Sequence, residues 1–141
     1  MDAICLDLKR LESGEELTID GIVFSQCVLI RIHINGGSFD SLEVFPDSLA
    51  VFSELERSLA GSGLYLLFSC ACGMADDGGW DYVRVTHAES TITWSFHRDR
   101  AYLFRFKKDL YRMAIAECAK QIDLLDPEMP VEPAFIVYPE E

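Results

Sequence analysis

The chain has 141 residues, of which 50% are hydrophobic, and its formal net charge is −12. This length fits a single domain over residues 1–141, and the hydrophobic content excludes an intrinsically disordered chain. The negative charge argues against nucleic acid or an anionic membrane as the partner and favours a basic protein. Apolar runs fall far short of the ~20 residues of a membrane helix. The N-terminal residues lack a basic region followed by an apolar core, so we expect a cytoplasmic protein with reduced cysteines.

Strands are predicted for most of the first third of the chain, because apolar and polar residues alternate there. The predicted stretches are residues 3–8, 17–24, 27–35 and 38–45. Asp20-Gly21 favours a tight turn that divides the second stretch into a strand pair. Asn35-Gly36-Gly37 favours another turn, so the third and fourth stretches are expected to form a hairpin.

A helix is predicted next, followed by a buried strand. Pro46-Asp47-Ser48 is a typical helix start, and Gly61 is a typical residue after a helix end. Between them, apolar residues recur at helical spacing at positions 49, 52, 55 and 59. Residues 64–72 are then almost continuously apolar, which favours a strand buried on both faces.

The second half of the sequence repeats this order of strands followed by a helix. Strands are predicted over 80–88, 91–97 and 101–106, and a helix over 107–125. Residues 126–141 form an acidic tail that contains prolines, and its apolar segment 134–138 is expected to dock as an edge strand or against the core. We therefore predict an α+β fold, with a largely antiparallel meandering sheet of about six to eight strands and two helices.

Cys70 and Cys72 are candidates for a metal site, because residues two apart in a strand point to the same face. Zinc usually takes four ligands, as two separated pairs. The remaining cysteines and histidines are isolated in separate predicted elements: Cys5, Cys27, Cys118, His33, His87 and His97. Buried structural thiols and no cofactor are therefore the favoured interpretation. A zinc-binding structural or regulatory module that uses Cys70 and Cys72 is an alternative.

The segment from residue 68 to 106 resembles a pattern found in small bacterial proteins of uncharacterised function. That pattern runs Phe-x-Cys-x-Cys-Gly, three residues, Cys-x-Gly, and then a strand that contains tryptophan. The matching residues here are Phe68, Cys70, Cys72, Gly73, Gly79 and Trp94. The third cysteine of the pattern is replaced by Asp77, so the resemblance does not imply a three-cysteine metal or redox site.

The turn after Cys72 combines acidic residues, glycines and one tryptophan. It lacks the alternating carboxylates of a calcium-binding loop. Tryptophan is enriched at the centres of protein interfaces. We therefore predict a protein interface at Asp76, Asp77, Trp80 and Asp81, with the tail from Glu128 to Glu141 as the second choice.

Basic residues concentrate near the last predicted strand and the start of the second helix. They are Arg98, Arg100, Arg105, Lys107, Lys108 and Arg112. Internal charge balance with the acidic tail explains them most simply, and a small anion site is an alternative.

The sequence carries no nucleophile elbow, metalloprotease motif or phosphate loop, so we predict no enzymatic activity. The leading hypothesis is an acidic protein-interaction domain, and its specific form is an immunity or antitoxin-like protein that neutralises a basic bacterial toxin. A small-ligand binder or an enzyme of another type is the third hypothesis. The sequence does not decide the oligomeric state.

Overall fold

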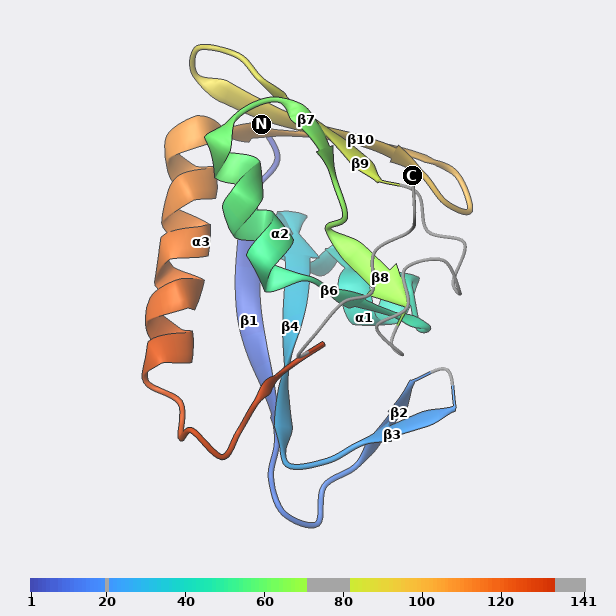
Figure 1. Ribbon diagram of the computed structural model, residues 1–141. Coiled ribbons are helices and arrows are strands. Elements are labelled where there is room, and N and C mark those ends of the chain that lie inside the picture. The colour runs from blue at the N-terminus through green and yellow to red at the C-terminus, as the bar shows by residue number, and fades with distance from the viewer. Residues whose placement is uncertain (20, 71–81, 134–141) are drawn as a thin grey trace.

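The computed structural model describes residues 1–19, 21–70 and 82–133, and it has the predicted α+β fold (Figure 1). In these residues the strands do not form a single sheet. They fall into two four-stranded sheets and two two-stranded sheets, in which antiparallel pairs predominate. No helix in this part of the chain has both the length and the apolar character needed to cross a membrane.

The first four-stranded sheet is built on the pair β1–β4. Its strands are β1 (Ile4–Leu11), β4 (Cys27–Ile34), β5 (Phe39–Asp40) and β12 (Val131–Glu132). β1 and β4 are antiparallel over their whole length, with Leu6 opposite Ile32. The strong alternation of β4 explains its central place, because its isoleucines are fully buried on the core face. β5 pairs with one side of β4 antiparallel, and β12 pairs with it in parallel.

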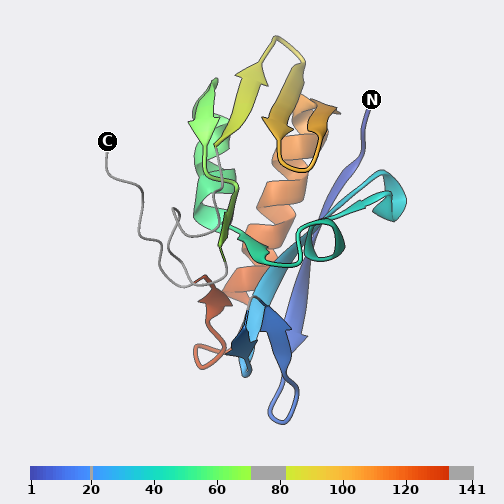
Figure 2. The same cartoon turned by 90° about the vertical axis from the view of Figure 1, so that its right-hand side faces the viewer.

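The second four-stranded sheet is an antiparallel meander at the opposite end of the molecule (Figures 1 and 2). In spatial order it consists of β11 (Ala101–Lys107), β10 (Thr91–His97), β9 (Val83–His87) and β7 (Gly63–Tyr65). Ile92, Trp94 and Phe96 alternate inward from β10 and are buried. The strands predicted over 91–97 and 101–106 are confirmed, and the described part of the strand predicted over 80–88 begins at Val83.

Helix α3 (Lys108–Asp123) joins the two large sheets into one core. It runs beside β1 in Figure 1, and its buried face carries Tyr111, Ile115 and Cys118. The N-terminus also ties the sheets together, because the Asp2 N–H donates to the Arg105 carbonyl at 2.8 Å. The resulting main core is rich in aromatic rings. The predicted helix over 107–125 is confirmed with slightly shorter bounds.

A small hairpin, β2 (Leu17–Ile19) and β3 (Ile22–Phe24), projects from the end of the molecule farthest from β9–β11 (Figures 1 and 2). Its pairing confirms the predicted strand pair, although residue 20 lies outside the described residues. The hairpin covers the lower part of the face of β4 that points away from the main core. A second, smaller cluster fills this contact: Leu11, Ile19, Phe24, Cys27, Leu29 and Leu49.

The predicted strand over 38–45 is wrong for most of its length. After the 3₁₀ turn Asn35–Gly37, only Phe39–Asp40 is strand. Asp40 ends the strand because its carboxylate accepts the Leu42 N–H at 3.1 Å, and this contact caps helix α1 (Ser41–Val44). A capping side chain therefore overrides the alternation of the sequence.

The predicted helix start at Pro46 is also wrong. Ser48–Ala50 forms strand β6, and helix α2 begins only at Phe52 and runs to Arg57, followed by the 3₁₀ turn Ser58–Ala60. Ser48–Ala50 is a strand and not the start of a helix because it pairs antiparallel with β8 (Phe68–Cys70), which lies about twenty residues later in the sequence.

The apolar run 64–72 does not form the one strand that was predicted. It is divided into β7, in the β9–β11 sheet, and β8, which pairs with β6. The division falls at Leu66, whose N–H donates to the buried Glu54 carboxylate at 2.9 Å instead of to a neighbouring strand. Residues 71 and 72, and the segment 134–138 that was predicted to dock, lie outside the described residues.

Candidate functional site

The predicted interface residues Asp76, Asp77, Trp80 and Asp81 lie outside the described residues, as do Cys72, Gly73 and Gly79. Their arrangement therefore stays a prediction. The described part of the pattern is the strand that leads into this segment. Phe68 and Cys70 are buried in β8, and Trp94 is fully buried in β10, where its ring centroid lies 6.3 Å from that of Phe68. These three matched residues belong to the core.

The thiols of Cys5, Cys27 and Cys118 all have a raised pKa. Burial raises the pKa of Cys118 to about 12. Burial also raises the pKa of Cys27, and burial together with the Asp7 carboxylate raises the pKa of Cys5. A raised pKa disfavours nucleophilic chemistry at these three thiols, because the thiolate is the reactive form. Within residues 1–19, 21–70 and 82–133, no three histidine, cysteine or carboxylate side chains come close enough to hold a metal ion.

A network of charged side chains lies on the face of the β1–β4 pair that points away from the main core. His33 Nε2 lies 3.0 Å from the Asp7 carboxylate, and its Nδ1 lies 3.9 Å from Asp40. Arg31 donates hydrogen bonds from Nε and Nη2 to the Asp40 carboxylate, and these bonds hold the pKa of Asp40 below its usual value. Since Asp40 is buried and also caps α1, the network holds β1, β4 and α1 together. Its charged groups are engaged with one another, so we assign it a structural role.

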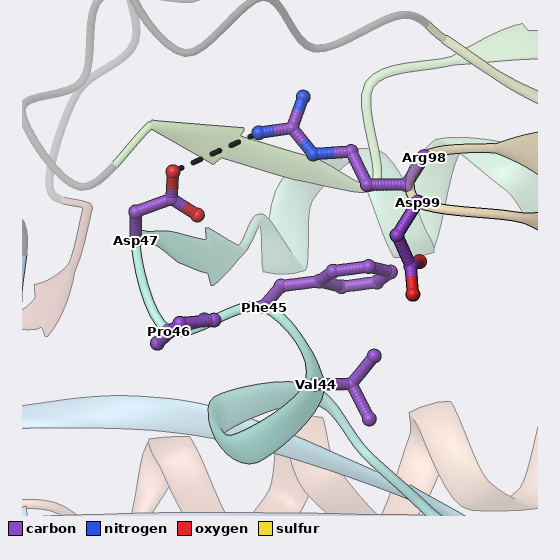
Figure 3. A pocket seen from close by; sticks show the side chains of 6 residues that line it. All are labelled: Val44, Phe45, Pro46, Asp47, Arg98 and Asp99. Atoms are coloured by element: carbon purple, nitrogen blue, oxygen red, sulfur yellow. Dashed lines mark ion pairs between the residues drawn. The ribbon is translucent and has the colours of Figure 1, made fainter.

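A hollow of about 650 Å³ lies between the chain leading into β6 and the β10–β11 turn (Figure 3). Its walls are Val44, Phe45, Pro46, Asp47, Arg98 and Asp99. Arg98 approaches Asp47 to 3.7 Å across it. Asp99 accepts a hydrogen bond from the Tyr102 hydroxyl at 2.9 Å, which lowers the pKa of Asp99. This is where the small-ligand hypothesis would place a ligand, but both carboxylates and the arginine already have partners.

The predicted basic cluster is spread along β11. Arg98 and Arg100 lie at the turn before this strand, and Lys107 and Lys108 lie at its other end. A strand of this length separates its ends by roughly 20 Å. The Arg100 guanidinium also stacks over the Tyr102 ring at 4.5 Å. The structure therefore does not bring these residues together as one anion site.

Two acidic turns meet at the hairpin end of the molecule. The turn between β1 and β2 contributes Glu12, and the turn after α3 contributes Asp126 and Glu128. These three residues line one hollow of about 250 Å³ together with Ser13, Gln26 and Met129. Glu15 and Glu16 follow directly in the first turn and are exposed as well. We call the five carboxylates of Glu12, Glu15, Glu16, Asp126 and Glu128 the acidic end.

Hydrogen bonds hold the backbone of the acidic end in place, and its carboxylates have no ion-pair partner among the described residues. The Glu15 N–H donates to the Glu12 carbonyl at 3.0 Å, and the Glu128 N–H donates to the Asp126 carboxylate at 3.0 Å. Farther along, the Val28 N–H donates to the Pro130 carbonyl at 2.9 Å, which ties the second turn to β4. None of the ion pairs between described residues involves these five carboxylates.

This meeting of two turns was not predicted from the sequence, although Glu128 belongs to the tail predicted as the second-choice interface. One signal was available in the sequence. Residues 11–26 and 123–130 contain seven acidic residues and no lysine or arginine.

Comparison with known proteins finds no matching family model, curated protein or solved structure. The function must therefore be argued from the surface and the charges of the chain itself.

Proposed function

We propose that this chain is a protein-interaction domain whose partner is a basic protein, and that it acts as an immunity or antitoxin-like protein by covering that partner. The observation that carries the proposal is the acidic end, where five exposed carboxylates gather without a basic partner among the described residues. The carboxylates of such a surface repel one another, and the approach of a positively charged surface lowers the free energy.

Charge complementarity would increase the rate at which the chain associates with a basic partner. An acidic surface accelerates the encounter with a basic protein and disfavours acidic competitors. The hydrogen bonds that hold both turns reduce the ordering cost of binding, because the backbone that carries the carboxylates is already in place. The segment with Asp76, Asp77, Trp80 and Asp81, predicted from the sequence as an interface, would supply a second contact, with Trp80 as its apolar anchor.

The test pairs this chain with the product of the neighbouring gene, since toxins and their immunity proteins are encoded side by side. Co-expression should rescue growth, and calorimetry should detect a 1:1 complex that weakens with salt. The triple variant Glu12→Lys/Asp126→Lys/Glu128→Lys should slow association at least tenfold. Absence of both binding and rescue would overturn the proposal.

A matched control separates location from total charge. Glu56→Lys/Glu89→Lys/Asp109→Lys changes the net charge equally at three exposed carboxylates away from the acidic end. It should slow association much less. A further variant, Asp77→Lys/Trp80→Ala, tests the turn separately. If only this variant weakens binding, the interface lies at the turn and the acidic end is a solvated surface.

A further inference from the structure

Strand β1 has one edge with which no strand among the described residues pairs along most of its length. On its other side, β1 pairs with β4, and Leu6 lies opposite Ile32. The Ile32 N–H donates to Ser41 Oγ at 2.9 Å, so it points away from β1. In an antiparallel pair the opposite residue then also points its backbone groups outward. By alternation, the N–H and C=O groups of Leu6, Leu8 and Arg10 all point to the free edge.

A groove of about 720 Å³ follows this edge. The consecutive residues from Cys5 to Arg10 all line it, and Glu117 and Gln121 of α3 form its far wall. Successive residues of a strand point to opposite faces. A hollow that touches six of them in a row must therefore run along the strand edge, where it reaches the backbone. Helix α3 runs alongside β1 on the side away from β4 (Figure 1), and the groove lies between the helix and the strand edge.

We propose that a second copy of this chain occupies the groove by pairing its own β1 antiparallel with this one, about a two-fold axis through Leu8. A long strand edge with no proline or glycine is a template for such pairing. The two copies of the β1–β4 sheet would then form one continuous sheet. This proposal concerns the edge of β1, which ends next to Glu12 of the acidic end, and it does not rest on the proposed function.

The charges of β1 select this register. With the axis at Leu8, Asp7 lies opposite Lys9 of the second copy, and this pair occurs twice by symmetry. An axis at Asp7 would place two aspartates together, and an axis at Lys9 would place two lysines together. Opposite charges across a strand pair stabilise it and like charges destabilise it, each by about 0.2–1 kcal/mol. The sequence of β1 is thus complementary to itself in one register.

An apolar stripe on α3 supports the same arrangement. Leu110, Met113 and Leu124 are 52%, 63% and 75% exposed. With Glu117 and Gln121 they recur at steps of three and four, so they share one side of the helix, the side that lines the groove. In the proposed dimer both copies of α3 lie on the same face of the continuous sheet. Their stripes then face each other, and exposed apolar surface becomes covered.

The groove is also a region where two strongly acidic chains can approach. Its charged lining consists of Lys9, Arg10 and Arg31 against Asp7 and Glu117. The formal net charge of −12 resides elsewhere. Because interactions beyond about 8 Å are largely screened at physiological salt, the local balance governs the contact.

Light scattering and sedimentation equilibrium test the dimer. The wild-type chain should have twice its monomer mass of 15.9 kDa. Asp7→Lys alone and Lys9→Asp alone should each weaken the dimer about tenfold or more, because like charges then meet at both symmetric positions. A mixture of the two variants should restore association as a heterodimer, since every pair is again opposite in sign. Circular dichroism confirms that each variant is folded.

A second pair of variants tests the backbone of the edge. Arg10→Pro removes only an outward-pointing N–H, whereas Arg10→Ala keeps that N–H and removes the side chain. The proline variant should be monomeric and folded, and the alanine variant should remain a dimer. A wild-type chain that is monomeric up to about 1 mM overturns the proposal and leaves the edge to a strand of another protein. Failure of the charge-swapped mixture to associate overturns the register.

Discussion

The β9–β11 sheet and the β2–β3 hairpin stand at opposite ends of the molecule and differ in both core and charge (Figure 2). The sheet covers the large aromatic core, and residues 82–112 contain seven basic and three acidic residues. The hairpin rests on a cluster of six buried residues, and the turns beside it carry only acidic charges. The larger core lies at the sheet end, whereas the carboxylates at the other end form no ion pair with the described residues.

The largest effect is expected at the sheet end. Trp94 is fully buried, and its ring lies 5.2 Å from Phe106 and 6.0 Å from Tyr111, measured between centroids. Trp94→Ala should lower the free energy of unfolding by about 3–5 kcal/mol, because the surrounding rings cannot close the cavity. Urea denaturation followed by far-UV circular dichroism measures this loss.

The matched change at the hairpin end is Phe24→Ala. We expect a smaller loss, because the hairpin has few neighbours and can open locally without unfolding the rest. Hydrogen exchange should show fast exchange at Leu17 and Phe24, whose N–H groups face the partner strand, in both the wild type and Trp94→Ala. An equal loss for the two variants would mean that the clusters form one cooperative core.

Elements with strong local patterns could be predicted from the sequence. Strand β10 and helix α3 appeared with nearly correct bounds, because a strict alternation and a helical stripe each identify one buried face. The regions that failed depend on distant residues. The run 64–72 is divided by a hydrogen bond from Leu66 to Glu54, and Ser48–Ala50 is a strand because β8 lies beside it. No local pattern encodes such partners.

The acidic end and the edge of β1 were harder to predict from the sequence. The acidic end combines Glu12 with Asp126, which only the fold brings to one hollow. The open edge of β1 depends on which strands pair with β4 and on where α3 packs, and periodicity determines neither. The composition of residues 11–26 and 123–130 did indicate a local excess of negative charge, although not its shape.

A substitution at Glu54 tests how the sheet end is joined to the rest of the molecule. It is buried, pairs with Arg57, and accepts the Leu66 N–H between β7 and β8. Glu54→Ala should cost about 1–3 kcal/mol, because it leaves a buried backbone N–H without an acceptor. The control is Glu56→Ala, at an exposed position of the same helix, which should change stability by less than about 0.5 kcal/mol. Equal effects of the two variants would contradict the bridging role of Glu54.

The ion pair between Asp40 and Arg31 should make the stability of the protein depend on pH in the acidic range. Arg31 lowers the pKa of Asp40 in the folded state, so the contact stabilises the fold above the unfolded pKa near 3.9 and is lost as pH falls through the folded value. Asp40→Asn should cost about 1 kcal/mol at neutral pH, since Arg31 is partly exposed. The difference from the wild type should shrink below about pH 4. A constant difference between pH 7 and pH 2 would show that capping of α1, and not charge, determines the contribution of Asp40.

The smallest effect bears most directly on the difference between the two ends. Glu12→Gln/Glu128→Gln removes like-charge repulsion at the acidic end, so the free energy of unfolding should rise by up to about 0.5 kcal/mol at low salt. Glu89→Gln/Asp109→Asn removes two carboxylates that lie among basic residues, so it should lower stability by a similar amount. Thermal unfolding at low salt and at 1 M salt measures both, and high salt should abolish both shifts because it screens exposed charges. Shifts of the same sign would mean that the sheet end and the acidic end do not differ in local electrostatic field. That result would contradict the proposal that the acidic end binds a basic partner.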